Sequence, residues 1–394
     1  MLDAGKVWTG TINADAGSPI VGVDRVGLYD STLRDGEQTV GVNLGPQQKL
    51  EIATALSSLG VDRIEAGFPR ISDDDVKSYE LIMDAGLDAE IWGFSRAVPA
   101  DIEQLLDLGV RGAVIESPVS DSKLAAYGMS RETVLDRIVT AVSWASDNDV
   151  VVCYFAVDST RADLGFLAEV YQASVEAGAR ELAVVDTLGI AAPEAASFLV
   201  TKVRSWVGPD VPIHWHGHND FGLATAGSIA AVRAGATWVQ GTVNGMGERA
   251  GNANLPEFAL ALEALYGVTT GMRFERIQEV AELVRSLSGY DLEPYKPLTG
   301  RNLFVRESGA VAAQFHDPPA VEPYSSEVVS ASRGIVLGKK SGLASIEIKS
   351  RELGIEIPDE RRGELLAAVK GLSVSKGGLV SDEEFVGLAK SMVG

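Results

Sequence analysis

The sequence of 394 residues predicts a (β/α)8 TIM barrel, an α/β fold, followed by a small C-terminal subdomain. Three observations predict this fold class. Short β-rich apolar runs alternate with helical stretches from about residue 26, eight such units fit within roughly 240 residues, and polar residues follow the ends of the apolar runs. A doubly wound open sheet is the alternative, but no GxGxxG turn follows the first apolar run.

The eight expected strands are short runs rich in β-branched and aromatic residues. They lie at 26–32, 63–68, 90–95, 112–117, 151–157, 181–186, 212–218 and 238–243. Between them, apolar residues recur at three- and four-residue spacing, which is typical of amphipathic helices, and several of these segments end in a capping Gly. The clearest expected helices lie at 46–60, 131–148, 163–178, 222–235 and 255–267.

Three stretches fall outside or at the edges of this repeat. We expect residues 1–22 to form an N-terminal arm, 23–290 the catalytic barrel, and 291–394 a linker, a lid and a helical subdomain. The last part contains the proline-rich "HDPPAVEPYSSE" and two amphipathic stretches, around 360–371 and 382–392. Such appendages often cover the mouth of a barrel.

Composition excludes several classes of function. The 55 acidic side chains outnumber the 34 Lys and Arg, giving a formal net charge of −21, so neither nucleic acid nor an anionic membrane is an expected partner. No stretch has the roughly 18–20 apolar residues of a membrane span. The lone Cys153 cannot form an intramolecular disulfide, which favours a cytoplasmic protein.

Histidines are concentrated in "HWHGHND", where His214, His216 and His218 alternate along one expected strand. Alternation places them on one face, as a transition-metal site requires, although chance histidines at a strand end give the same pattern. In a (β/α)8 barrel the chemistry lies at the carboxyl ends of the strands. The polar residues at the expected strand ends are Asp30, Arg34, Asp35, Gln38, Glu65, Glu116, Asp186, Thr187, Glu248, Arg249 and Asn252. Oxygen and imidazole ligands without thiolates suit Mg²⁺, Mn²⁺, Co²⁺ or Zn²⁺, and a nearby arginine suits a 2-oxo acid.

Four ordered motifs carry a family resemblance: "DSTLRDGEQTVGVNL", "IEAGFP", "HGHNDFGLA" and "NGMGERAGNANLPE". With them, residues 26–390 resemble the DRE-TIM metallolyase superfamily, in its Claisen-condensing branch of homocitrate synthase and 2-isopropylmalate synthase. The resemblance implies a divalent metal held by Asp35, His216, His218 and Asn252, with Asn254 the less favoured alternative to Asn252. It makes His214 a supporting or core residue.

The same resemblance implies the condensation of acetyl-CoA with a 2-oxo acid, as in amino-acid biosynthesis. Arg34 would contact the oxygen of the oxo acid and Thr187 its carboxylate, with Gln38 and Glu65 lining the pocket. Arg161 matches an arginine that homocitrate synthases direct towards the distal carboxylate of 2-oxoglutarate, although a surface arginine is the competing interpretation. The resemblance also implies a homodimer.

The sequence departs from the family pattern at two positions. Val157 stands where the family has Glu, and Val311 stands where it has His, so the usual proton-transfer groups are missing. His316 and Glu116 are the candidates to replace them. The alternatives are a metal-dependent 2-oxo-acid aldolase or lyase that uses no CoA, and a non-catalytic paralogue.

Overall fold

Eight parallel strands form a closed barrel in the computed structural model, which describes residues 2–393. The strands are β1 Gly27–Asp30, β2 Arg63–Glu65, β3 Glu90–Arg96, β4 Gly112–Pro118, β5 Val151–Val157, β6 Glu181–Asp186, β7 Ile213–Gly217 and β8 Trp238–Gly241. The predicted (β/α)8 barrel is confirmed, and the open sheet is excluded because β8 pairs with β1, with Gly27 opposite Trp238.

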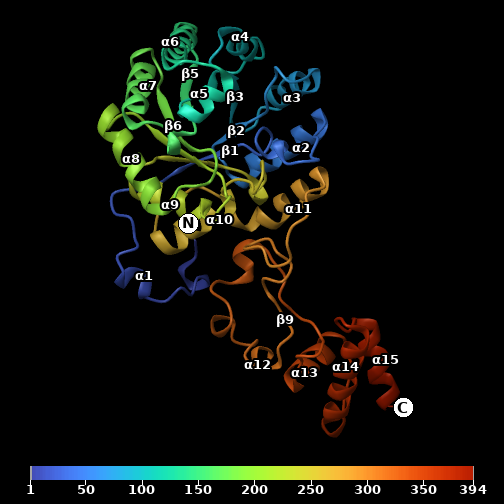
Figure 1. Cartoon of the computed structure of the whole chain (residues 1–394). Coiled ribbons are helices and arrows are strands. Elements are labelled where there is room, and N and C mark those ends of the chain that lie inside the picture. Colours follow the sequence, from blue (N-terminus) through green and yellow to red (C-terminus); the bar gives the residue numbers. More distant parts are fainter. Residues whose placement is uncertain (1, 394) are drawn as a thin grey trace. The chain divides into compact units, whose positions relative to one another are not determined.

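Helices alternate with the strands and lie outside them (Figure 1). They are α2 Pro46–Leu59, α3 Asp73–Asp84, α4 Pro99–Asp107, α6 Arg131–Asp147, α7 Leu164–Glu176, α8 Pro193–Val207, α9 Ala224–Arg233, α10 Leu255–Tyr266 and α11 Ile277–Ser288. A short extra helix, α5 Asp121–Tyr127, is inserted between β4 and α6. No helix within residues 2–393 is both long and apolar enough to cross a membrane.

The chain divides into two compact units. The first contains Asn13–Leu292, with the short helix α1 Ile12–Asp15 at its start, and holds the whole barrel. The second combines Leu2–Ile12 with the chain from Glu293 onward, and within it Trp8 N donates a hydrogen bond to Pro323 O. The N-terminal segment therefore splits between the two units near residue 12.

The second unit has its own small core. Its elements are β9 Val305–Arg306, α12 Gly309–Ala312, β10 Gly334–Ile335, α13 Leu343–Glu352, α14 Arg362–Lys376 and α15 Asp382–Val393. Ile346, Leu365 and Phe385 from the three long helices are fully buried against one another in one apolar cluster. The amphipathic stretches expected around 360–371 and 382–392 correspond to α14 and α15.

Side chains that alternate inward from the strands fill the barrel. The central apolar layer is made of Tyr29, Trp92, Phe94, Val114, Cys153, Phe155, Ala183 and Val185. Because strand side chains alternate between faces, residues two positions further along each strand project inward at its carboxyl end. This layer therefore separates a floor at the amino ends of the strands from a mouth at their carboxyl ends.

Candidate functional site

Three predicted metal ligands lie together at the barrel mouth. His216 is on β7 and His218 directly follows it, while Asp35 begins the turn after β1. The Nε2 atoms of His216 and His218 are 3.3 Å and 3.6 Å from Asp35 Oδ2. All three side chains are buried, and their potential ligand atoms lie within 4.8 Å of one another.

Asn252 adjoins these three residues. It forms a β-bridge with His218, and its side-chain Nδ2 donates to Met246 O at 2.9 Å, which leaves Oδ1 free to act as an acceptor. Asn254, the alternative, bridges Thr242 and donates to Glu257 at 2.8 Å. We call Asp35, His216, His218 and Asn252 the mouth cluster.

The mouth cluster contains unsatisfied polar atoms that a cation would explain. Asp35 Oδ1, His216 Nδ1, His218 Nδ1 and Asn252 Oδ1 are buried without a hydrogen-bond partner among the described residues. Buried polar atoms rarely stay unpaired, since each costs about 1–3 kcal/mol. Two imidazoles, a carboxylate and an amide oxygen are also a donor set that suits a divalent metal, so these residues fit such an ion.

The protonation states of His218 and Asp35 match this use. Burial lowers the pKa of His218 to about 4, although Asp35 opposes the shift, so the imidazole is neutral at pH 7. Burial works to raise the pKa of Asp35, but the Arg34 guanidinium and the two histidines hold it below its usual range. A neutral imidazole and an ionised carboxylate are the forms that bind metals.

Arg34 lies between the mouth cluster and the barrel wall. Its Nε donates to Glu65 Oε2 at 2.6 Å, its Nη1 is 3.3 Å from Asp35 Oδ2, and its Cζ lies 4.2 Å from the centre of the Phe94 ring. Tyr29 donates to the other oxygen of Glu65 at 3.1 Å. The Nη2 atom of Arg34 is buried without a partner, so one guanidinium donor remains for a bound oxygen.

Thr187 and Gln38 lie on neighbouring loops of the mouth. Thr187 directly follows β6, and its hydroxyl accepts a hydrogen bond from Asp158 N at 2.8 Å. Gln38 ends the turn Gly36–Gln38 and, with Arg34, borders a cavity of about 440 Å³.

Glu116 and Val157 line a second cavity, of about 270 Å³, at the ends of β4 and β5. Burial raises the pKa of the Glu116 carboxyl, while the charges of Arg34 and Lys123 work against that rise. No other described residue forms a hydrogen bond or ion pair with the Glu116 side chain. Val157, which stands where the family has Glu, therefore borders the same cavity as the Glu116 carboxyl group.

Arg161 is engaged within the rim of the barrel. It follows β5 in the turn Ser159–Arg161, and its guanidinium lies 2.6 Å from Asp158 Oδ2, with Nε 3.0 Å from Oδ1. Ser120 also donates to Asp158. His316 and Val311 belong to the second unit, where Val311 lies in α12 and His316 is exposed shortly after it.

His214 belongs to a separate group beneath the apolar layer. Its Nε2 is 2.8 Å from Glu181 Oε2 and its Nδ1 is 3.2 Å from Gln240 Nε2. Arg63 donates to both oxygens of Glu181, at 2.6 Å and 3.1 Å, and stacks between the rings of Trp92 and Trp238. We call Arg63, Glu181 and His214 the floor cluster. The only sequence signal for it was a charged residue at the start of two apolar runs.

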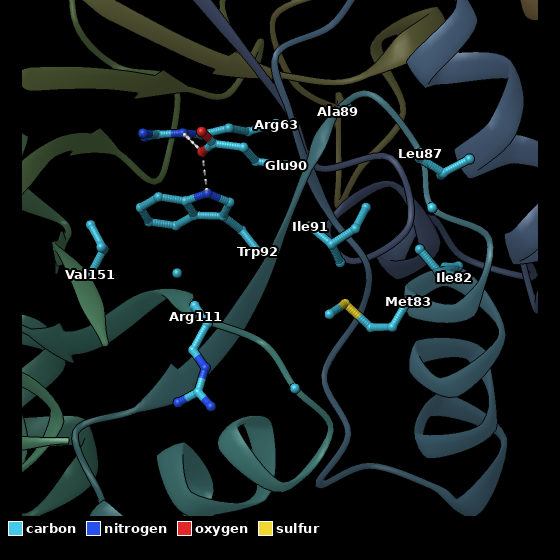
Figure 2. Close-up of a pocket in the computed structure, with 13 residues that line it drawn as sticks. Arg63, Ile82, Met83, Leu87, Ala89, Glu90, Ile91, Trp92, Arg111 and Val151 are labelled. Carbon is cyan, nitrogen blue, oxygen red and sulfur yellow. Dashed lines mark hydrogen bonds and ion pairs between the residues drawn. The ribbon is translucent and has the colours of Figure 1, made fainter. Parts of the chain in front are cut away.

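A third cavity, of about 500 Å³, opens beside the floor cluster and is bordered by Arg63, Glu90 and Trp92 (Figure 2). Glu90 accepts from both Arg63 Nε and Trp92 Nε1, at 2.9 Å and 3.1 Å. This cavity lies at the amino ends of the strands, away from the mouth cluster at their carboxyl ends. The cavity beside the floor cluster is therefore not the candidate active site.

Known proteins resemble this chain in sequence and in fold. The HMGL-like family model matches residues 25–284. A homocitrate synthase of Methanopyrus kandleri is 43% identical over 89% of this chain and 88% of its own, and a 2-isopropylmalate synthase of Methanocaldococcus jannaschii is 40% identical over 94% and 72%. The crystal structure of hydroxymethylglutaryl-CoA lyase from Pseudomonas aeruginosa shares the fold, with a TM-score of 0.62 at 21% identity over 68% of this chain and 95% of the other.

Proposed function

The chain is an enzyme of the HMGL-like family, and from that premise we propose that it condenses acetyl-CoA with a 2-oxo acid in a divalent-metal-dependent reaction. The products would be a 2-hydroxy acid that carries one more carboxylate than the oxo acid, and free CoA. One observation carries the proposal: four residues from three strand ends converge, each with a buried polar atom that lacks a partner.

Asp35, His216, His218 and Asn252 would hold the cation, which supplies Lewis-acid polarisation of the ketone when bound. Arg34 would donate its free Nη2 to the same oxygen and stabilise the negative charge that develops there. Glu65 positions this guanidinium through its 2.6 Å hydrogen bond, and Phe94 supports its face. Thr187 would hold the carboxylate of the oxo acid.

Carbon–carbon bond formation requires removal of a proton from the methyl group of the thioester. Glu116 is the group of the first unit proposed to accept it, because its side chain has no hydrogen-bond or ion-pair partner among the described residues and burial raises its pKa above the ordinary value. The methyl carbon then attacks the ketone carbon, the ketone oxygen takes up a proton, and water cleaves the thioester to release CoA. His316 is proposed as the alternative proton-transfer group.

The test is CoA thiol release from acetyl-CoA in the presence of Mg²⁺ or Mn²⁺ across a panel of 2-oxo acids. Release that requires one acid and disappears in Asp35→Asn is the expected result. If no acid gives release from metal-loaded protein, the condensation is excluded. Cleavage of a 2-hydroxy acid without CoA would then favour the aldolase or lyase alternative, and binding without turnover the non-catalytic one. A homodimer, implied by the family resemblance, and a cytoplasmic location, expected from the single cysteine, stay predictions.

A further inference from the structure

The relatives leave the substrate class open. A homocitrate synthase and a 2-isopropylmalate synthase are similarly close to this chain, at 43% and 40% identity. Homocitrate has three carboxylates, whereas 2-isopropylmalate has two carboxylates and an isopropyl group. An acetyl unit contributes one carboxylate. The difference therefore lies in the oxo acid, which has either a second carboxylate or an apolar side chain.

We propose that the 2-oxo acid of this enzyme is a monocarboxylate with a short, uncharged, apolar side chain, an inference that rests on the function proposed above. Three features of the mouth carry it: the engagement of Arg161, the apolar surface beside Arg34, and the carboxylates that border both mouth cavities.

Arg161 is the residue that the sequence offered for a distal carboxylate, and its guanidinium is already paired. Two of its nitrogens bind the Asp158 carboxylate at 2.6–3.1 Å, and that carboxylate is fully buried. Releasing Arg161 would leave the buried carboxylate without its charge partner, which is strongly unfavourable. The Nε and Nη2 side of the guanidinium is therefore occupied, and a second substrate carboxylate would meet only Nη1 and the remaining Nη2 hydrogen of a cation whose charge Asp158 already offsets.

The surface beside Arg34 is aromatic and aliphatic. Phe94 lies under the guanidinium, and the centre of its ring is 5.5 Å from the centre of the Phe68 ring. The centre of the Phe155 ring is 6.0 Å from Arg34 Cζ. Val157 is packed against the same apolar cluster. An apolar side chain would gain free energy by leaving water here, whereas a carboxylate would lose hydration against these rings.

Carboxylates border both cavities that adjoin the site. The 440 Å³ cavity is bordered by Glu37, Asp74 and Asp75, and Lys49 pairs with only the first and last of these. The 270 Å³ cavity is bordered by Glu116. A second negative charge on the substrate would therefore approach like charges, which disfavours it.

Arginines on the second cavity are the counter-argument. Arg96 is held by Asp101 through two hydrogen bonds, at 2.7 Å and 3.0 Å. Arg137 Nη1 donates to the sulfur of Met129, at 3.9 Å, and among the described residues Arg137 is the one cation bordering the two cavities without a carboxylate partner. Arg137 is exposed on α6, so a carboxylate bound there would stay hydrated. If the enzyme instead preferred a dicarboxylate, Arg137 is the side chain that would bind the second carboxylate.

The experiment measures binding and turnover separately on the full chain loaded with Mn²⁺. Calorimetry gives the affinity for pyruvate, 2-oxoisovalerate, oxaloacetate and 2-oxoglutarate, and CoA release gives kcat/KM for the same acids. We expect at least one of the two monocarboxylates to bind about tenfold or more tightly than either dicarboxylate. If the condensation occurs, its kcat/KM should be higher by a similar factor. Preference for a monocarboxylate in binding without CoA release would support this inference and exclude only the condensation.

Variants locate the discrimination. Glu116→Gln should reduce the ratio between monocarboxylate and dicarboxylate affinities, because it removes a negative charge at nearly constant volume, and Asp74→Asn should do so to a smaller extent. Arg137→Ala is the matched control, and the ratio should not change in it. Equal or tighter binding of 2-oxoglutarate, particularly if lost in Arg137→Ala or Arg161→Ala, would overturn the inference, as would the absence of binding of every acid.

Discussion

Two polar clusters occupy opposite ends of one barrel, and both use histidines of β7, but they differ in how completely the protein satisfies them. In the floor cluster, both nitrogens of His214 and both oxygens of Glu181 have protein partners. In the mouth cluster, each of the four side chains keeps one buried atom without a partner among the described residues. Among the described residues beside the floor cluster, Gln240 Oε1 shares that condition.

The difference separates structural from functional polar groups. A satisfied network strengthens in a low-dielectric interior and stabilises the fold, whereas an unsatisfied one costs free energy unless a ligand completes it. Cys153, Glu181 and His214 also have potential ligand atoms within 4.8 Å, as the mouth residues do, yet Arg63 already takes both oxygens of Glu181. Proximity of ligand atoms is therefore a weaker indicator of a metal site than the absence of protein partners.

The largest expected effect is on metal affinity at the mouth. Asp35→Asn removes the charged donor of the mouth cluster, so Mn²⁺ affinity measured by calorimetry should fall by more than about a hundredfold, and CoA release should be lost. Glu181→Gln is the matched control on the floor and should keep metal affinity within about threefold. A similar loss in both variants would break the distinction between the clusters.

The second effect is on stability at the floor. Glu181→Ala leaves the buried Arg63 with only Glu90, which is largely exposed, and removes the partner of His214. Removing one member of a buried ion pair costs about 3–5 kcal/mol, so urea denaturation should show a loss of that size. Metal-free Asp35→Asn should lose less, because Arg34 keeps its bond to Glu65. Equal losses would mean that the mouth cluster is as structural as the floor.

The floor cluster should also set part of the acid stability. Burial works to raise the pKa of Glu181, but His214 and Arg63 lower it to about 2 from its ordinary 4.5. Because the folded-state pKa is depressed, the stabilisation is fully present above pH 4.5 and is lost as the pH falls towards 2, up to about 3 kcal/mol. Urea unfolding of the wild type between pH 5 and 2.5 should therefore be steeper in pH than that of Glu181→Gln. Parallel curves would show that Glu181 titrates normally in the folded protein.

Local sequence pattern was enough to predict the barrel and to place the histidines of one strand near the polar turn after β1, whereas the choice of Asp35, His216 and His218 as ligands came from the family resemblance. Strand alternation places His216 and His218 one period apart, and the carboxyl-end rule brings the turn after β1 to the same face. Both inferences depend on separations of a few residues, or on the closure that eight repeated units impose.

Pairings that depend on side-chain geometry could not be predicted. Arg161 turns back onto Asp158, which adopts a left-handed conformation, with φ of 69°, at the end of β5. The partners of His214 come from β6 and β8, and only the strand register, which pairs Ala183 with His214 and His214 with Trp238, brings them within reach. The sequence motifs also do not indicate which buried polar atoms remain without a hydrogen-bond partner in the folded protein.

The smallest effect tests whether the two clusters communicate through the barrel interior. The Trp238 ring stacks on His214, with a centroid distance of 5.4 Å and an interplanar angle of 13°, and its face lies 3.9 Å from Arg63 Cζ. Trp238→Phe keeps an aromatic face with a weaker attraction for the cation, so the free energy of unfolding should fall by about 1 kcal/mol in urea titrations. Mn²⁺ affinity should stay unchanged, because the central apolar layer separates His214 from the mouth cluster. If affinity instead falls tenfold, the alternating side chains of β7 transmit the position of the floor to the mouth. The floor would then have to be counted as part of the metal site.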